Sequence, residues 1–152
     1  LDKHWTQKYV IARESYYFRL LQTDYDQVLS MSADAVGRDY ARLYDGPQAR
    51  DKTLGSGMEW KIKVLSVTLN ADAVGFKATV RFEKTPKRTE AETADPPQYF
   101  IATLSYEYRT SMKGQEKDLI QNPLGYKVTS YRVDAEIGTV SPAVPMAMLE
   151  RS

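Results

Sequence analysis

The spacing of apolar residues changes near residue 58, and this change restricts the fold more than any other feature of the chain. Over the first 46 residues, apolar side chains recur every three or four positions, which is typical of helices. From Met58 onward they recur at every second position, most clearly between Val74 and Phe82. Helices followed by four such strands predict an α+β fold with an antiparallel sheet that has one face in water.

The first helix is predicted over residues 4–21, and it carries apolar side chains on two faces. At about 100° per residue, Ile11 and Phe18 fall nearly opposite the main stripe. The main stripe consists of Trp5, Tyr9, Ala12, Tyr16 and Leu20. Two apolar faces need two burial surfaces, so this helix is either fully buried in the core or part of an interface with another chain. The eleven tyrosines of the chain suit both half-buried core positions and interfaces.

Capping residues and breaks in the pattern predict the remaining elements. Thr23 and Ser32 are each expected to cap a helix, and Gly46-Pro47 is expected to end the third helix. The alternation in the first strand slips by one residue at Leu65, which predicts a β-bulge. The charged, proline-containing residues 84–98 predict a long mobile loop. We expect one domain over residues 1–138 and an extended or disordered tail over residues 139–152.

A tight turn is predicted directly before the last strand, which is expected over residues 128–137. The segment Asn122-Pro123-Leu124-Gly125 has the residue order of a type I β-turn. Asn122 is expected to hydrogen-bond the backbone ahead of it, Pro123 fixes its own φ, and Gly125 relieves crowding at the exit. The turn is therefore expected to set the direction in which the last strand begins.

Composition argues against several functions. The formal net charge of +1 disfavours a dedicated nucleic-acid-binding protein, and the absence of cysteine excludes disulfides and thiolate chemistry. The only histidine, His4, has no neighbours with the spacing of a catalytic triad or a zinc site, so we expect no metal and no cofactor. No apolar run reaches the roughly 18 residues of a membrane span. Because the chain begins at Leu1 without a methionine, we expect it to be part of a longer protein.

Carboxylates on the strands are the remaining candidates for catalysis. Asp134 and Glu136 share one face of the last strand, and Glu107 lies on the strand before it. A curved sheet that gathered such acids around a pocket would support proton transfer. The alternative is that these acids face water or form ion pairs with Arg109 and Arg132.

Three segments in order resemble one protein family. They are Tyr9–Tyr17, Gly75–Lys84, and the turn at residues 122–125 together with Tyr131–Asp134. Over residues 4–138 the chain resembles the periplasmic domain of the eighth VirB component of bacterial type IV secretion systems. Two features depart from the family pattern: Ser15-Tyr16-Tyr17-Phe18 stands where the family more usually has Ser-Tyr-Asp-Trp, and the residues after Gly138 have no counterpart.

The resemblance implies a fold like that of nuclear transport factor 2, with the helices packed in the hollow of a curved four-stranded antiparallel sheet. It implies a periplasmic domain of a single-pass inner-membrane protein, with the membrane segment upstream of Leu1. It also implies a non-enzymatic assembly factor that binds other channel subunits and forms a weak homodimer. Conjugation systems and effector-secreting systems share the family, so the cargo stays open.

Two surfaces are expected to carry this function. The exposed side of the turn at residues 122–125 is expected to bind a partner subunit. Self-association is expected through the first helix, from the pattern at Ile11 and Phe18, with Tyr9 as the best single contact and Glu136 on the last strand as its partner. An isomerase or cyclase and a small-ligand-binding module are the alternatives on this fold. An enzyme needs an open pocket with convergent acid or base groups on the concave side of the sheet, whereas a scaffold can fill that space with side chains.

Overall fold

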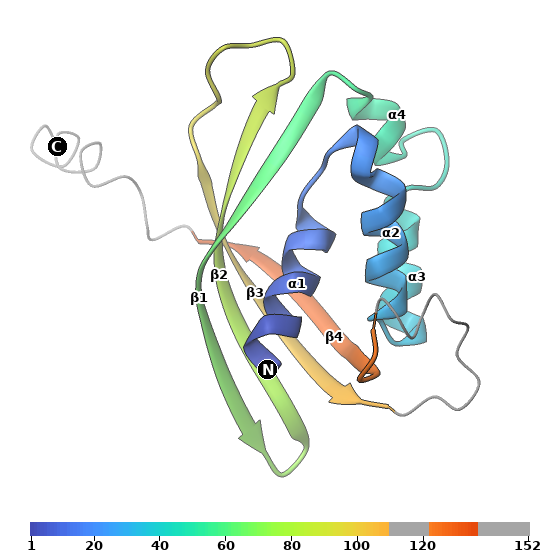
Figure 1. Ribbon diagram of the computed structural model, residues 1–152, viewed down its shortest axis with the longest axis vertical. Helices are drawn as coiled ribbons and strands as arrows, with labels where there is room; N and C mark the ends of the chain where they lie inside the picture. Colours follow the sequence, from blue (N-terminus) through green and yellow to red (C-terminus); the bar gives the residue numbers. More distant parts are fainter. Residues whose placement is uncertain (110–121, 137–152) are drawn as a thin grey trace, which may run out of the picture.

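The computed structural model describes residues 1–109 and 122–136, with helices first and a curved sheet after them (Figure 1). The helices are α1 (Asp2–Glu14), the 3-10 helix η1 (Phe18–Leu20), α2 (Leu21–Ser30), α3 (Asp34–Arg42) and the short α4 (Arg50–Leu54). The strands are β1 (Met58–Asp72), β2 (Gly75–Arg88), β3 (Gln98–Tyr108) and β4 (Tyr126–Ala135). They form one antiparallel sheet in the order β1-β2-β3-β4, which confirms the predicted α+β architecture.

The predicted helix over residues 4–21 is wrong in its last third, because α1 ends at Glu14. Ser15 adopts an extended conformation with φ −77° and ψ 159°. Tyr16 then forms an antiparallel bridge with Trp60 of β1, with backbone N–H···O distances of 3.1 and 2.9 Å. This bridge occupies the backbone groups that a continuous helix would use, so a tertiary contact overrides the apolar periodicity. Phe18 consequently lies in η1 and not on the far face of α1.

The predicted caps are also wrong. Thr23 lies inside α2, which begins two residues earlier at Leu21, and Ser32 lies in the link between α2 and α3. The Ser32 hydroxyl donates to the carbonyl oxygen of Val28 at 2.6 Å instead of capping the next helix. The third helix ends at Arg42, ahead of the predicted stop at Gly46-Pro47.

The sheet confirms one prediction and corrects another. The register between β1 and β2 shifts between Val64 and Ser66, which confirms the bulge at Leu65. The predicted loop over residues 84–98 is shorter, because β2 continues to Arg88. Pro86 is tolerated there since β2 pairs with β3 only up to Lys84, so its missing N–H costs no hydrogen bond to β3. The predicted tail, residues 139–152, lies outside the described residues.

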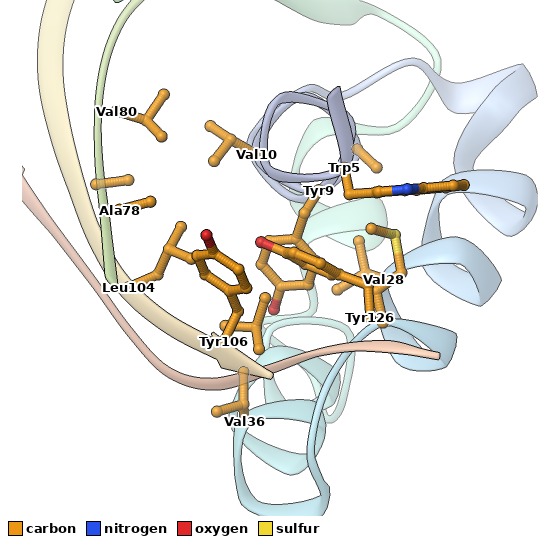
Figure 2. Packing of buried hydrophobic residues seen from close by; sticks show 14 of the residues in the cluster. Trp5, Tyr9, Val10, Val28, Val36, Ala78, Val80, Leu104, Tyr106 and Tyr126 are labelled. Carbon is orange, nitrogen blue, oxygen red and sulfur yellow. The ribbon is translucent and has the colours of Figure 1, made fainter. Parts of the chain in front are cut away.

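The helices lie in the hollow of the sheet, and their side chains fill it (Figures 1 and 2). Tyr9 and Val10 of α1 pack against the concave face of β2 and β3, where Val80 and Leu104 are also buried. The largest fully buried side chains are aromatic: Tyr9, Tyr16, Tyr40, Tyr126 and Phe82. Much of the high tyrosine content therefore belongs to the core.

Candidate functional site

The turn at residues 122–125 joins three parts of the fold. The Asn122 carbonyl oxygen accepts a hydrogen bond from the Gly125 N–H at 3.2 Å, and its side-chain Oδ1 accepts one from the Tyr126 N–H at 2.9 Å. Its Nδ2 donates to the carbonyl oxygens of Tyr126 at 2.7 Å and of Ser30 at 3.1 Å. Asn122 is buried, so these bonds satisfy its amide and tie β4 to the end of α2. Sequence reasoning missed the bond to Ser30, because no local pattern indicates a contact across 92 positions.

Gly125 holds the turn against the end of β3. Its φ of 68° lies in the left-handed region that favours glycine. A Cβ at this position would lie 1.7 Å from the carbonyl oxygen of Arg109, and the Arg109 N–H donates to the Gly125 carbonyl oxygen at 2.7 Å. Pro123 and Leu124 remain exposed. The backbone contacts of Gly125 thus fix the turn in a position where two apolar side chains, Pro123 and Leu124, are exposed to solvent.

A second surface is a groove of about 550 Å³ between α1 and α2. Ile11 lines it and keeps 40% of its surface exposed. Asp24 is half-buried on the other wall, and burial raises the pKa of its carboxyl group to about 6. The remaining lining residues are His4, Gln7, Lys8, Ala12, Thr23 and Gln27. The groove is therefore an open depression with an exposed aliphatic side chain, Ile11, on one wall and a half-buried carboxylate, Asp24, on the other.

The structure separates the residues predicted for self-association. Tyr9 is fully buried and bonded to the Ser32 hydroxyl and the Arg13 guanidinium, each at 2.9 Å, so a direct contact through its side chain does not fit this structure. Glu136 pairs with Arg81 at 2.8 Å on the outer, convex face of the sheet, away from the helices. Of these four predicted residues, Ile11 and Phe18 are the two that present exposed apolar surface.

The strand carboxylates form ion pairs outside the hollow. Asp134 pairs with Arg132 at 2.9 Å, and Glu107 pairs with Arg109 at 2.5 Å. The preceding residues on the two strands, Val133 and Tyr106, pack against or within the core, so by alternation both acids lie on the convex face. The ion-pair alternative is confirmed, and neither acid reaches the concave side. Within residues 1–109 and 122–136, no group of three or more His, Asp or Glu side chains is placed to hold a metal ion.

A cluster of cations and aromatic rings lies where α1, α4 and the sheet meet. The Lys84 ammonium stands 3.9 Å from the centre of the Trp60 ring, and the Arg50 guanidinium stands 4.9 Å from it. The Arg13 guanidinium lies 4.1 Å from the Tyr131 ring centre. Burial lowers the pKa of Lys84; the nearby Glu14 carboxylate acts in the opposite direction, and Arg50 lowers the pKa further. The Nη1 atom of Arg50 is buried without a hydrogen-bond partner among the described residues, so this guanidinium keeps a donor for a further acceptor beside the Trp60 ring.

These features define an α+β domain whose own side chains fill the concave side and whose acids Asp134, Glu107 and Glu136 form ion pairs. Its fold is that of nuclear transport factor 2-like domains, as the resemblance implied. The family model described as VirB8 protein matches residues 1–136, and the chain belongs to the VirB8 family. No helix in the described part of the chain has the length and apolarity that crossing a membrane requires.

Relatives and solved structures agree with this assignment. A type IV secretion system protein VirB8 of Brucella abortus is 41% identical over 140 residues, which is 92% of this chain and 57% of the relative. The chain thus spans a little over half the length of such curated relatives. The crystal structure of the soluble domain of TrwG from Bartonella grahamii is 38% identical with a TM-score of 0.81, covering 89% of this chain and 92% of that one. TraE in complex with 4-(1H-pyrrol-1-yl)pyridine-2-carboxylic acid is 38% identical with a TM-score of 0.81, covering 89% and 95%.

Proposed function

We propose that this domain is the periplasmic part of an inner-membrane assembly subunit of a type IV secretion channel, and that it acts by binding proteins without catalysis. The observation that carries the proposal is the family match across residues 1–136. The aromatic packing of the concave side supports a scaffold over an isomerase or cyclase, because an enzyme of this fold needs open space there. Pull-down of the full-length protein from its native membrane tests this: recovery of other channel subunits is expected, and recovery of none of them would contradict the proposal.

The proposal includes a membrane segment upstream of Leu1. Carbonate extraction of the full-length protein should leave it in the inner-membrane fraction, and a protease added to spheroplasts should reach this domain. Release of the protein by carbonate would contradict the anchoring without affecting the pull-down result.

Self-association is proposed through the groove between α1 and α2, with Ile11 as the central contact. Ile11→Asp should abolish a concentration-dependent dimer in analytical ultracentrifugation at high micromolar concentration. Leu43→Asp is a matched control, because Leu43 is 39% exposed at the end of α3 and outside the groove. A strict monomer of the unchanged chain at every concentration, or an equal effect of the two substitutions, would contradict this interface.

The exposed side of the turn is proposed to bind a partner subunit. Leu124→Ser should reduce recovery of the partner in the pull-down while leaving thermal stability unchanged, since Leu124 is 44% exposed. Unchanged recovery would show that the turn has only a structural role.

A second candidate function is the binding of small aromatic carboxylic acids. Three solved structures of TraE are complexes with such acids. In this chain the cluster of Arg13, Arg50 and Lys84 beside Trp60 offers cations for a carboxylate and rings for an aromatic body. Titration with 2-chloroisonicotinic acid, followed by NMR, should give saturable shifts that Lys84→Gln weakens. Equal binding by the two proteins would place the ligand elsewhere.

A further inference from the structure

The turn between β1 and β2 holds an aliphatic side chain in solvent. Val74 is 88% exposed, more than any other large apolar residue of the described chain. The turn around it is ordered by Asp72, whose Oδ1 accepts hydrogen bonds from the N–H groups of Val74 at 2.8 Å and Gly75 at 3.1 Å. Its Oδ2 pairs with the Lys77 ammonium at 3.0 Å. The only acid of the tip is thereby neutralised, and the apolar side chain is fixed outward.

This tip lies at the bottom of Figure 1, in the half of the molecule where α1 begins, and projects beyond the start of α1. The Phe76 ring, two residues after Val74, stacks on Tyr106 with 5.5 Å between ring centres. The Tyr106 hydroxyl donates to Asp2 in the first turn of α1 at 2.7 Å. One stacked ring and one hydrogen bond therefore connect the tip to the start of the chain. Leu1 beside it is 77% exposed.

We propose that the β1–β2 tip, residues 71–76 together with Leu1, rests on the lipid surface of the membrane and sets the orientation of the domain above it. This inference rests on the proposed membrane segment upstream of Leu1, which would bring this end of the domain closest to the bilayer. Exposed aliphatic and aromatic side chains on a neutralised tip suit insertion at the headgroup level. Lys3, exposed in the first turn of α1, offsets the charge of the neighbouring Asp2, so the start of the helix adds no net negative charge that anionic lipids would repel.

The membrane fits this tip better than a second copy of the chain does. The tip is narrow, and β2 pairs with β3 only from Phe76 onward, so residues 72–75 have no strand beside them except each other. A protein interface needs a broad patch, whereas membrane contact scales with the few apolar side chains that insert. Such a contact is weak alone, and a tether makes it effective by raising the local concentration.

The test uses the absence of cysteine in this chain, because a single introduced thiol can be labelled selectively. Val74→Cys and Lys52→Cys are each labelled with an environment-sensitive fluorophore; Lys52 is exposed in α4, at the opposite end of the sheet (Figure 1). A polyhistidine tag before Leu1 tethers the chain to vesicles of phosphatidylethanolamine and phosphatidylglycerol that contain a nickel-chelating lipid. Lipids with nitroxide groups then quench labels that reach the bilayer.

Quenching at position 74 should exceed that at position 52 severalfold. A label at Ala73→Cys should be quenched in the same way and lose that quenching in the Val74→Asp background, with an unchanged thermal midpoint. Equal quenching at positions 74 and 52 would overturn the inference. So would a label at position 74 that becomes shielded without vesicles as protein concentration rises, since the tip would then contact another copy. The tag replaces the proposed membrane segment, so this result is independent of whether the full-length protein proves to be anchored.

Discussion

Gly125 gives the sharpest test of how the fold is held together, because the smallest substitution there has two separable costs. Gly125→Ala places an L-residue at a φ of 68°. It also introduces a Cβ that would lie 1.7 Å from the Arg109 carbonyl oxygen and 2.7 Å from its carbonyl carbon. Both atoms belong to the backbone at the end of β3, so no side-chain rotation relieves the contact.

The expected loss follows from these contacts. The left-handed conformation costs an L-residue about 1 to 2 kcal/mol. Relief of the clash requires the two backbones to separate, which breaks the 2.7 Å bond from the Arg109 N–H to the Gly125 carbonyl oxygen, a net loss of about 1 kcal/mol. We expect a total of about 3 kcal/mol, which is a large fraction of the roughly 5 to 15 kcal/mol that stabilises a typical domain. Gly125→Val should cost more, and through the same turn it should also weaken assembly.

Urea unfolding followed by the fluorescence of Trp5 and Trp60 measures this loss as a shift of the transition midpoint. Gly46→Ala is the matched control, because Gly46 has a φ of 75° and no atom within 4 Å of its hypothetical Cβ. It should show only the conformational cost of about 1 kcal/mol. Equal losses for the two variants, or no loss for Gly125→Ala, would refute the claim that contact with Arg109 makes glycine necessary.

Three further substitutions test other parts of the structure. Asn122→Ala should lower the unfolding free energy by about 2 to 3 kcal/mol in the same urea assay, because it leaves buried backbone groups of β4 and α2 without their partner; a neutral effect would show that water replaces the amide. The Asp24 pKa is raised by burial, so the folded chain holds this proton more tightly and stability falls as pH rises from 3.8 to about 6. Asp24→Asn should remove that slope and stabilise the chain by about 1 kcal/mol at neutral pH, a value reduced for partial exposure, whereas Asp95→Asn in the exposed β2–β3 loop should leave the slope intact. The Asp2 pKa is lowered by the hydroxyls of Tyr108 and Tyr106, so its contribution is present above pH 3.8 and lost as pH falls through the folded-state pKa. Asp2→Asn should therefore flatten the acid side of a stability profile followed by circular dichroism, and an unchanged profile would show that this pair of bonds contributes nothing.

The acids illustrate what strand periodicity can and cannot predict. Alternation put Asp134 and Glu136 on one face of the last strand but left open whether the strand acids line a pocket or form ion pairs. The structure pairs Asp134 with Arg132 and Glu107 with Arg109, in each case two positions along the same chain segment. The bond from Asn122 to Ser30 had no such local signal. Residues from distant parts of the sequence also form the cationic cluster, whose members come from α1, α4 and three strands.

Tyr9 and Phe18 show the limit of a helical wheel. The wheel assigned both to one continuous helix, and it could not show that Tyr16 leaves the helix to pair with Trp60 of β1. It also could not distinguish an apolar stripe facing the sheet from one facing a partner, because both stripes are apolar. Burial of Tyr9 and exposure of Ile11 are properties of the packed chain.

The sequence by itself determined the order of helices and strands, the bulge at Leu65 and the family, because these depend on residues close to one another along the chain. Tertiary structure decided where α1 ends, which aromatic side chains fill the hollow and which apolar residues stay exposed. It also brought Phe76, Tyr106 and Asp2 together at one end of the molecule. The physical reason is that hydrogen bonds and burial between distant segments compete with local preferences, and their outcome depends on how the sheet curves around the helices.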